Sequence, residues 1–222
     1  MKKGKFTGDK KVGGSFLYDL EIKTVNKTLP YIPRWIETYH LTYSTIIWSL
    51  LIILSGYLSN KYGMNWLWLS SIMIVLQYLT DLYDGKLGRY RNTGLVKWGY
   101  YMDHFLDYFF LCAILISYSF VIPEDKEIIL FFILAILGGF MVNTYLAFAV
   151  SNEFRISYWK IGPTEIRILF ILINTWFIVF KKSYLYFTLP TFLILITLGL
   201  IIVVYRTQKR IWSIGARRGK QK

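Results

Sequence analysis

Six apolar stretches occupy most of this chain, and each approaches the length that a helix needs to cross a lipid bilayer. They cover residues 41–58, 66–82, 98–122, 128–150, 166–180 and 184–205. A hydrocarbon core about 30 Å thick is spanned by about 20 helical residues, because each residue adds about 1.5 Å to a helix. Hydrophobic residues make up 55% of the chain, more than a soluble globule could hide. We therefore predict an all-α, polytopic membrane protein with six transmembrane helices.

The positive charges favour one side of this topology. The chain has 26 Lys and Arg against 13 Asp and Glu, a formal net charge of +13. Basic residues crowd the N-terminal arm, the loop after the second helix, the exit of the fourth helix and the segment from Arg206 onward. The other side carries Lys61, Lys126, Lys181 and Lys182. The positive-inside rule then places both termini in the cytoplasm. No recognisable nucleic-acid-binding module accompanies the basic residues, so we expect membrane lipids as partners and no nucleic acid.

The order of these features predicts four regions along the chain. They are a basic cytoplasmic arm (1–29), an interfacial segment (30–40), a six-helix membrane domain (41–212) and a basic cytoplasmic tail (213–222). The interfacial segment mixes the aromatic residues Tyr31, Trp35 and Tyr39 with Arg34 and Glu37. That composition is typical of a stretch lying on the cytoplasmic leaflet.

Four aspartates stand near the cytoplasmic ends of the second and third helices: Asp81, Asp84, Asp103 and Asp107. The members of each pair are three or four residues apart and share one face of a helix. Antiparallel neighbouring helices would bring the two pairs together. Two carboxylates about 4 Å apart repel by about 4 kcal/mol at an effective dielectric constant near 20, so such a cluster needs cations. A ligand set of four carboxylates favours hard ions, and we predict two Mg²⁺ or Mn²⁺ ions before Zn²⁺.

The same stretch holds groups suited to a phosphate ligand. Arg89 lies five residues after Asp84, where a guanidinium can bind phosphate in bidentate fashion. Gly85 directly follows Asp84, and Gly99 precedes Asp103 by four residues. Both glycines leave room for a ligand beside the metal ions. The pattern therefore predicts a site for a diphosphate.

This pattern is similar to the signature of CDP-alcohol phosphatidyltransferases, D-x2-D-G-x2-A-R-x8/9-G-x3-D-x3-D. The matching positions are Asp81, Asp84, Gly85, Arg89, Gly99, Asp103 and Asp107. The one departure is Gly88, which stands where the family has Ala. The six-helix membrane core of the family also agrees with the six apolar stretches.

The resemblance implies transfer of a substituted phosphate from a CDP-linked donor to an alcohol, with release of CMP, in phospholipid biosynthesis. The four aspartates would hold the metal ions, and Asp107 is also the base in many members. Arg89 would bind the diphosphate, while Gly85, Gly88 and Gly99 would admit the nucleotide.

Two further features resemble the aminoalcohol phosphotransferase branch, whose members make phosphatidylcholine and phosphatidylethanolamine. Asp103 is followed by His104, and a Gly-Pro-Thr-Glu segment ending at Glu165 precedes the fifth helix. The branch implies CDP-choline or CDP-ethanolamine as donor and diacylglycerol as acceptor. His104, oriented by Glu165, would then be the base, since a neutral imidazole suits proton removal near its pKa.

Several alternatives stay open at this point. His104 could be a polar residue at the interface, with Glu165 stabilising a helix N-terminus through the macrodipole. The donor could be CDP-diacylglycerol and the acceptor a small polar alcohol. A cation transporter would use the aspartates as an ion path, and a non-catalytic membrane anchor would not need them. A homodimer contact is one use for the small residues Gly138, Gly139, Ala147 and Ala149.

Overall fold

The computed structural model describes residues 11–12, 17–151, 154–155, 162–180 and 185–219. Helices dominate it: α1 (Tyr18–Thr28), α2 (Thr38–Tyr62), α3 (Leu67–Tyr90), α4 (Val96–Ser119), α5 (Glu127–Ser151), α6 (Pro163–Phe180) and α7 (Leu185–Gly219). Short 3₁₀ turns lie at Leu29–Tyr31, Met64–Trp66 and Glu124–Lys126. A two-residue parallel pairing joins β1 (Lys11–Val12) to β2 (Phe154–Arg155). The predicted all-α class is confirmed.

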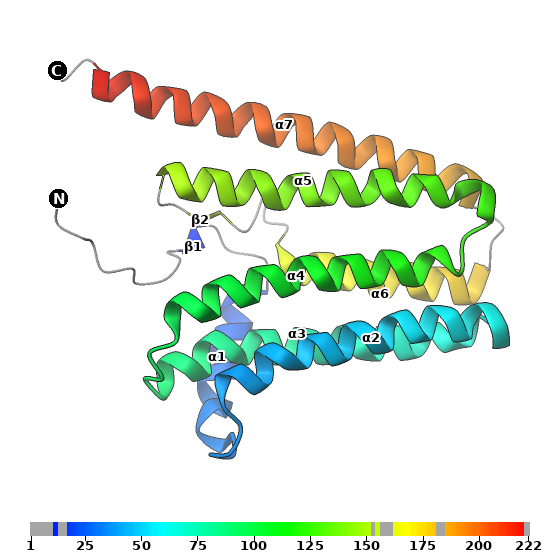
Figure 1. Ribbon diagram of the computed structural model, residues 1–222, viewed down its shortest axis with the longest axis horizontal. Helices are drawn as coiled ribbons and strands as arrows, with labels where there is room; N and C mark the ends of the chain where they lie inside the picture. The colour runs from blue at the N-terminus through cyan, green and yellow to red at the C-terminus, as the bar shows by residue number, and fades with distance from the viewer. Residues whose placement is uncertain (1–10, 13–16, 152–153, 156–161, 181–184, 220–222) are drawn as a thin grey trace.

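Helices α2 to α7 run along a common direction, and α1 crosses them near one end (Figure 1). Helix α2 packs against α3 and α4, α6 packs on α3, and α5 pairs with α7. The α3–α4 connection lies at the same end of the molecule as the start of α2 and the end of α7 (Figure 1). This end therefore gathers the segments that the charge pattern assigned to the cytoplasm.

In the part of the chain that the structure describes, four helical segments are long and apolar enough to cross a membrane: Thr38–Tyr62, Glu124–Ser151, Pro163–Phe180 and Tyr186–Ile214. They indicate an integral membrane protein. Helices α3 and α4 are each 24 residues long, so their length also suffices. Their aspartates and basic residues lower their hydropathy, and they are not among the four segments that are apolar enough. The prediction of six spans is thus met for four helices by composition.

Local chemistry explains where the first long helix begins. Glu37 and His40 form a capping box, in which each side chain accepts a hydrogen bond from the other residue's backbone N–H. Because this cap precedes the apolar stretch, α2 starts at Thr38 rather than at residue 41. The last residues of the predicted interfacial segment therefore belong to α2.

Small residues let the helices approach closely. A Cβ atom on Gly56 of α2 would lie 2.6 Å from the Cα of Ser117 on α4, so only glycine fits there. A Cβ atom on Gly139 of α5 would lie 2.9 Å from Leu200 of α7. Gly139 is thus used for packing within the chain, and the structure does not require a dimer contact to explain it.

Candidate active site

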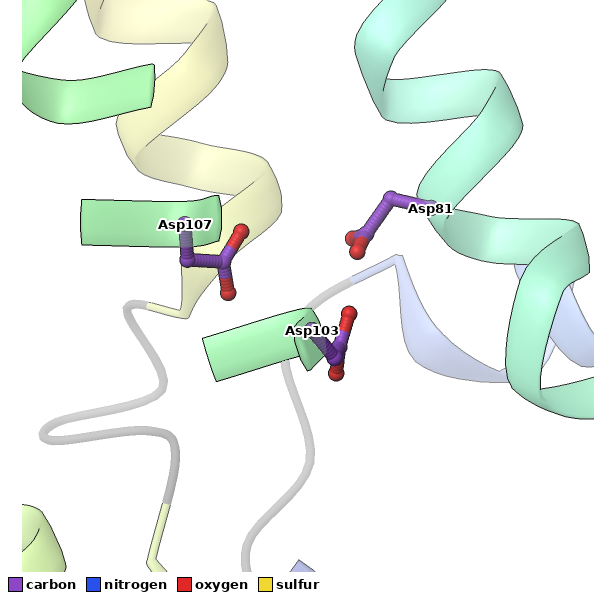
Figure 2. Close-up of side chains that lie close together, drawn as sticks. All are labelled: Asp81, Asp103 and Asp107. Atoms are coloured by element: carbon purple, nitrogen blue, oxygen red, sulfur yellow. The ribbon is translucent and has the colours of Figure 1, made fainter. Parts of the chain in front are cut away.

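Three of the four aspartates converge from two helices. Figure 2 shows Asp81 on α3 facing Asp103 and Asp107 on α4. One carboxylate oxygen from each lies within 4.8 Å of the others. Two oxygens bound to one Mg²⁺ lie at most about 4.2 Å apart, twice the Mg–O distance of about 2.0–2.1 Å, so modest side-chain rotations would bring the three onto one ion.

Asp84 completes the set from the buried side of α3. Only 5% of this residue is exposed, and its Oδ2 accepts a hydrogen bond of 2.5 Å from the hydroxyl of Thr42. Its Oδ1 is buried and accepts no hydrogen bond from any described residue. A buried carboxylate oxygen without a partner is costly, and a cation would satisfy it. The oxygen donors present therefore fit a divalent ion.

A pocket between α2, α3 and α4 joins these groups. Its lining comprises Leu41, Thr42, Thr45, Gln77, Asp81, Asp84, Asp103, Leu106 and Asp107. All four predicted metal ligands thus face one space, as expected from two antiparallel helices with paired aspartates. Thr42 and Thr45 of α2 line the same pocket with their hydroxyl groups, and both residues lie outside the signature stretch.

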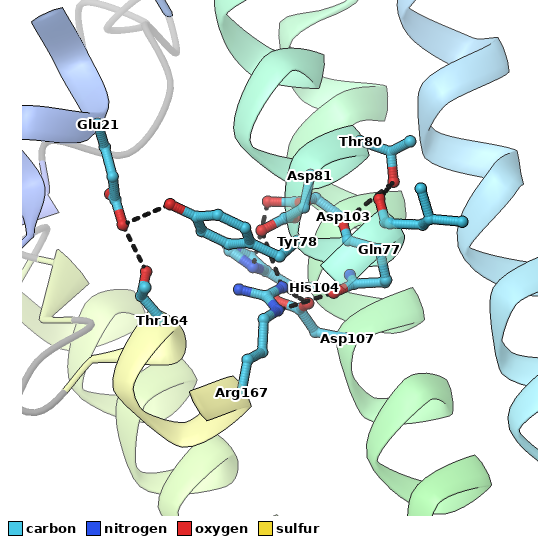
Figure 3. Close-up of polar contacts among 11 residues, drawn as sticks. Glu21, Gln77, Tyr78, Thr80, Asp81, Asp103, His104, Asp107, Thr164 and Arg167 are labelled. Atoms are coloured by element: carbon cyan, nitrogen blue, oxygen red, sulfur yellow. Dashed lines mark hydrogen bonds and ion pairs between the residues drawn. The ribbon is translucent and has the colours of Figure 1, made fainter. Parts of the chain in front are cut away.

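Arg167 on α6 is a member of the site that the sequence analysis missed. Its Nη2 lies 2.9 Å from Oδ2 of Asp81 and 3.4 Å from Oδ1 of Asp107. Its Nε donates a hydrogen bond of 2.7 Å to Gln77 (Figure 3). Only 6% of Arg167 is exposed. Its positive charge offsets part of the charge of the four carboxylates.

A sequence signal for Arg167 does exist. The residue lies within an otherwise apolar segment, and a charged side chain inside a spanning helix is a candidate functional residue by default.

The glycines of the signature differ in their surroundings. A Cβ atom on Gly99 would meet nothing within 4 Å, and one on Gly85 would meet only the guanidinium of Arg89 at 3.5 Å. These two positions border open space near the cluster. A Cβ atom on Gly88, in contrast, would lie 3.0 Å from the hydroxyl of Thr38. The structure places Gly88 at the contact between α3 and α2.

Arg89 extends the stripe of α3 that carries Asp81 and Gly85, because successive members are four residues apart. It is exposed near the C-terminal end of α3. A guanidinium in this position can meet a ligand that also reaches the carboxylates.

His104 lies beside the cluster, and its side chain is 13% exposed. Its Nδ1 is 3.8 Å from Oδ2 of Asp103, and the ring of Tyr100 meets it edge-on with centroids 4.4 Å apart. Tyr145 of α5 donates a hydrogen bond of 3.3 Å to the backbone carbonyl of His104. These contacts come from α4 and α5.

Glu165 makes a local contact at the start of α6. Its Oε2 accepts a hydrogen bond of 2.8 Å from the backbone N–H of Gly162. This is the helix-terminus role that the sequence analysis had kept as an alternative. The structure therefore brings the aspartates together and gives Glu165 a helix-capping contact.

A comparison with known protein families finds a match. Residues 32–205 match the CDP-alcohol phosphatidyltransferase family, and this match covers well over half of the chain. The match includes the whole aspartate stretch and α6, and it leaves out α1. No curated protein matches the chain.

Proposed function

The chain belongs to the CDP-alcohol phosphatidyltransferase family, and we propose that the pocket between α2, α3 and α4 is its active site. Members of this family are transferases of substituted phosphate groups that use a CDP-alcohol in lipid synthesis. The resemblance seen in the sequence is thereby confirmed at the level of the family, as is the assignment as an enzyme. The observation that carries the proposed site is the convergence of Asp81, Asp84, Asp103 and Asp107 on one pocket.

The family depends on divalent metal ions, and the carboxylate oxygens here fit that requirement. We assign Asp81, Asp84, Asp103 and Asp107 as ligands of Mg²⁺ or Mn²⁺. Bound ions supply Lewis acidity toward the donor diphosphate and offset charge on the departing CMP. Arg167 would orient Asp81 and Asp107 by its two ion pairs.

The donor would enter beside α3. Arg89 is exposed and binds the diphosphate, while the open flanks of Gly85 and Gly99 admit the nucleotide. Gly88 lies against Thr38, and we propose that its small size also lets α3 pack closely on α2.

We propose that the substrates are those of the aminoalcohol branch, with CDP-choline or CDP-ethanolamine as donor and diacylglycerol as acceptor. The proximity of His104 to Asp103 supports it, since an imidazole beside the acidic cluster can take the proton of an incoming hydroxyl. Glu165 would act through α6, where its hydrogen bond to Gly162 fixes the start of the helix that carries Arg167. The second candidate is CDP-diacylglycerol with a small polar alcohol, for which Asp107 would serve as the base.

A direct assay tests this proposal. Purified protein is incubated with Mg²⁺ or Mn²⁺ and each donor with its matching alcohol, and CMP release is measured. Faster release with CDP-choline or CDP-ethanolamine supports the aminoalcohol branch, and faster release with CDP-diacylglycerol supports the second candidate. Folded protein that releases no CMP with any pair would contradict both.

His104→Ala should lower the turnover number about 100-fold, the lower end of what a general base contributes. The matched control is His40→Ala, because the chain has two histidines and His40 caps α2 outside the pocket. Steady-state CMP release with diacylglycerol as acceptor is the measurement, together with the melting temperature of each variant. Turnover of His104→Ala at the wild-type rate would assign the base to another group.

We also propose that α3 and α4 cross the membrane, giving six spans with the site and both termini in the cytoplasm. The exposed side chains of Tyr31 and Trp35 support an interfacial segment before α2. In a Cys112→Ala background, an impermeant thiol reagent should label Lys97→Cys from the cytoplasmic side and Lys61→Cys from the other. Both lysines are exposed; Lys97 lies in the first turn of α4 and Lys61 in the last turn of α2. Labelling of both positions from one side would refute this topology.

A further inference from the structure

The N-terminal helix α1 lies outside the family match, which begins at residue 32, yet it is packed into the domain. Val25 is fully buried and Leu29 is 6% exposed, and both pack against Leu87 of α3. The hydroxyl of Thr28 forms a hydrogen bond of 2.6 Å with that of Tyr83 on α3. The segment that the sequence predicted as a basic arm therefore contains a helix that packs against α3 at Tyr83 and Leu87.

Glu21 lies one turn before Val25 on the same face of α1. Its Oε1 accepts a hydrogen bond of 3.0 Å from the hydroxyl of Tyr78 on α3. The same oxygen accepts a hydrogen bond of 2.8 Å from the hydroxyl of Thr164 on α6 (Figure 3). One carboxylate oxygen thus joins three helices.

Each hydroxyl donor stands one helical turn from a residue of the site. Tyr78 precedes Asp81 by three residues on α3, and Thr164 precedes Arg167 by three residues on α6. The ion pair between Arg167 and Asp81, at 2.9 Å, connects the same two helices, which run in opposite directions (Figure 1). The contacts of Glu21 and this ion pair therefore lie at the same level of the bundle and join α3 to α6 at one place.

We propose that Glu21 is a positioning residue of the metal site, supplied by a helix outside the family domain. By holding Tyr78 and Thr164 together, it sets the spacing of α3 and α6 at which Arg167 meets Asp81. The inference rests on the proposed function, because the cluster matters only if it holds the catalytic ions. Loss of Glu21 leaves the charge of Arg167 in place and disturbs only its placement, so the expected effect is poorer alignment of the carboxylates and weaker metal binding.

The test compares three variants of the full chain by Mn²⁺ binding, followed through the electron paramagnetic resonance signal of the free ion. Glu21→Ala should raise the Kd for Mn²⁺ about 10-fold, the lower end of the effect of losing an outer-shell contact. Glu21→Gln should bind within about twofold of wild type, since an amide oxygen can accept the same two hydrogen bonds. Asp19→Asn, an exposed position on the same helix, is the matched control and should bind as wild type does.

If Glu21→Ala does not fold, Tyr78→Phe and Thr164→Val each remove one donor from the same oxygen. Each should raise the Kd for Mn²⁺ by about threefold, and the pair together by about 10-fold. Wild-type Mn²⁺ affinity in a folded Glu21→Ala variant, or in the folded pair, would overturn the inference and leave the proposed function intact. Wild-type protein that binds no Mn²⁺ and releases no CMP would instead overturn the proposed function itself.

Discussion

Replacing Asp103 with Asn should reduce the rate of CMP release at least about 1000-fold while the protein stays folded in the membrane. A metal ion contributes several kcal/mol of charge stabilisation to such a transfer, and about 4 kcal/mol corresponds to that factor. Asp103 is the informative choice because the ion pairs of Arg167 are with Asp81 and Asp107 and survive the substitution. Steady-state CMP release in saturating Mn²⁺ measures the effect.

The matched control is Asp125→Asn, which removes a carboxylate that is 56% exposed in the turn before α5. It should keep full activity. Removing one of several like charges also predicts that Asp103→Asn melts no lower than wild type in the presence of a chelator. Full activity in a folded Asp103→Asn protein would exclude this residue as a metal ligand.

Replacing Arg167 with Met should destabilise the metal-free protein by about 3 kcal/mol. Removing one partner of a buried ion pair costs about 3–5 kcal/mol, and we expect the lower end because Asp81 and Asp107 keep 24% and 29% of their side chains exposed. For a chain of this length, about 3 kcal/mol corresponds to a melting temperature about 6–12 °C lower. Thermal unfolding in a chelator measures it.

Added Mn²⁺ provides the second half of this test. Without Arg167 the carboxylates lose their internal cation, so Mn²⁺ should raise the melting temperature of Arg167→Met by more than that of wild type. Arg34→Met removes an exposed arginine and should behave as wild type in both conditions. A variant Arg167→Met that melts like wild type in a chelator would show that the guanidinium does not stabilise the cluster.

The sequence predicted the local features of the site well. Aspartates three and four residues apart share a helix face whatever the surroundings, because helical periodicity is a local property of the backbone. Two such pairs on consecutive helices meet across a short connection, and the pocket lined by all four aspartates agrees with that expectation. The match of residues 32–205 to the family confirms the resemblance that these spacings indicated.

Composition predicted membrane crossing less clearly for the two helices that carry the site. Helices α3 and α4 carry the polar residues of the signature, and they are not among the segments that are apolar enough to span by composition. The same charges that make the site possible weaken the hydropathy signal from which spans are predicted. Similarly, α1 was hidden in a segment whose lysines suggested a basic arm, because its buried face is only a narrow stripe.

The sequence by itself determined the helices α2 to α7, the acidic pairs and the oxygen-rich character of the cluster, since these depend on neighbours within a few residues. Only the tertiary structure decided which cation and which carboxylate reach the site from elsewhere in the chain. Arg167 is 86 residues from Asp81, and Thr164 is 143 residues from Glu21. Those contacts depend on how α1, α3 and α6 pack together, and packing between distant helices has no local period to reveal it.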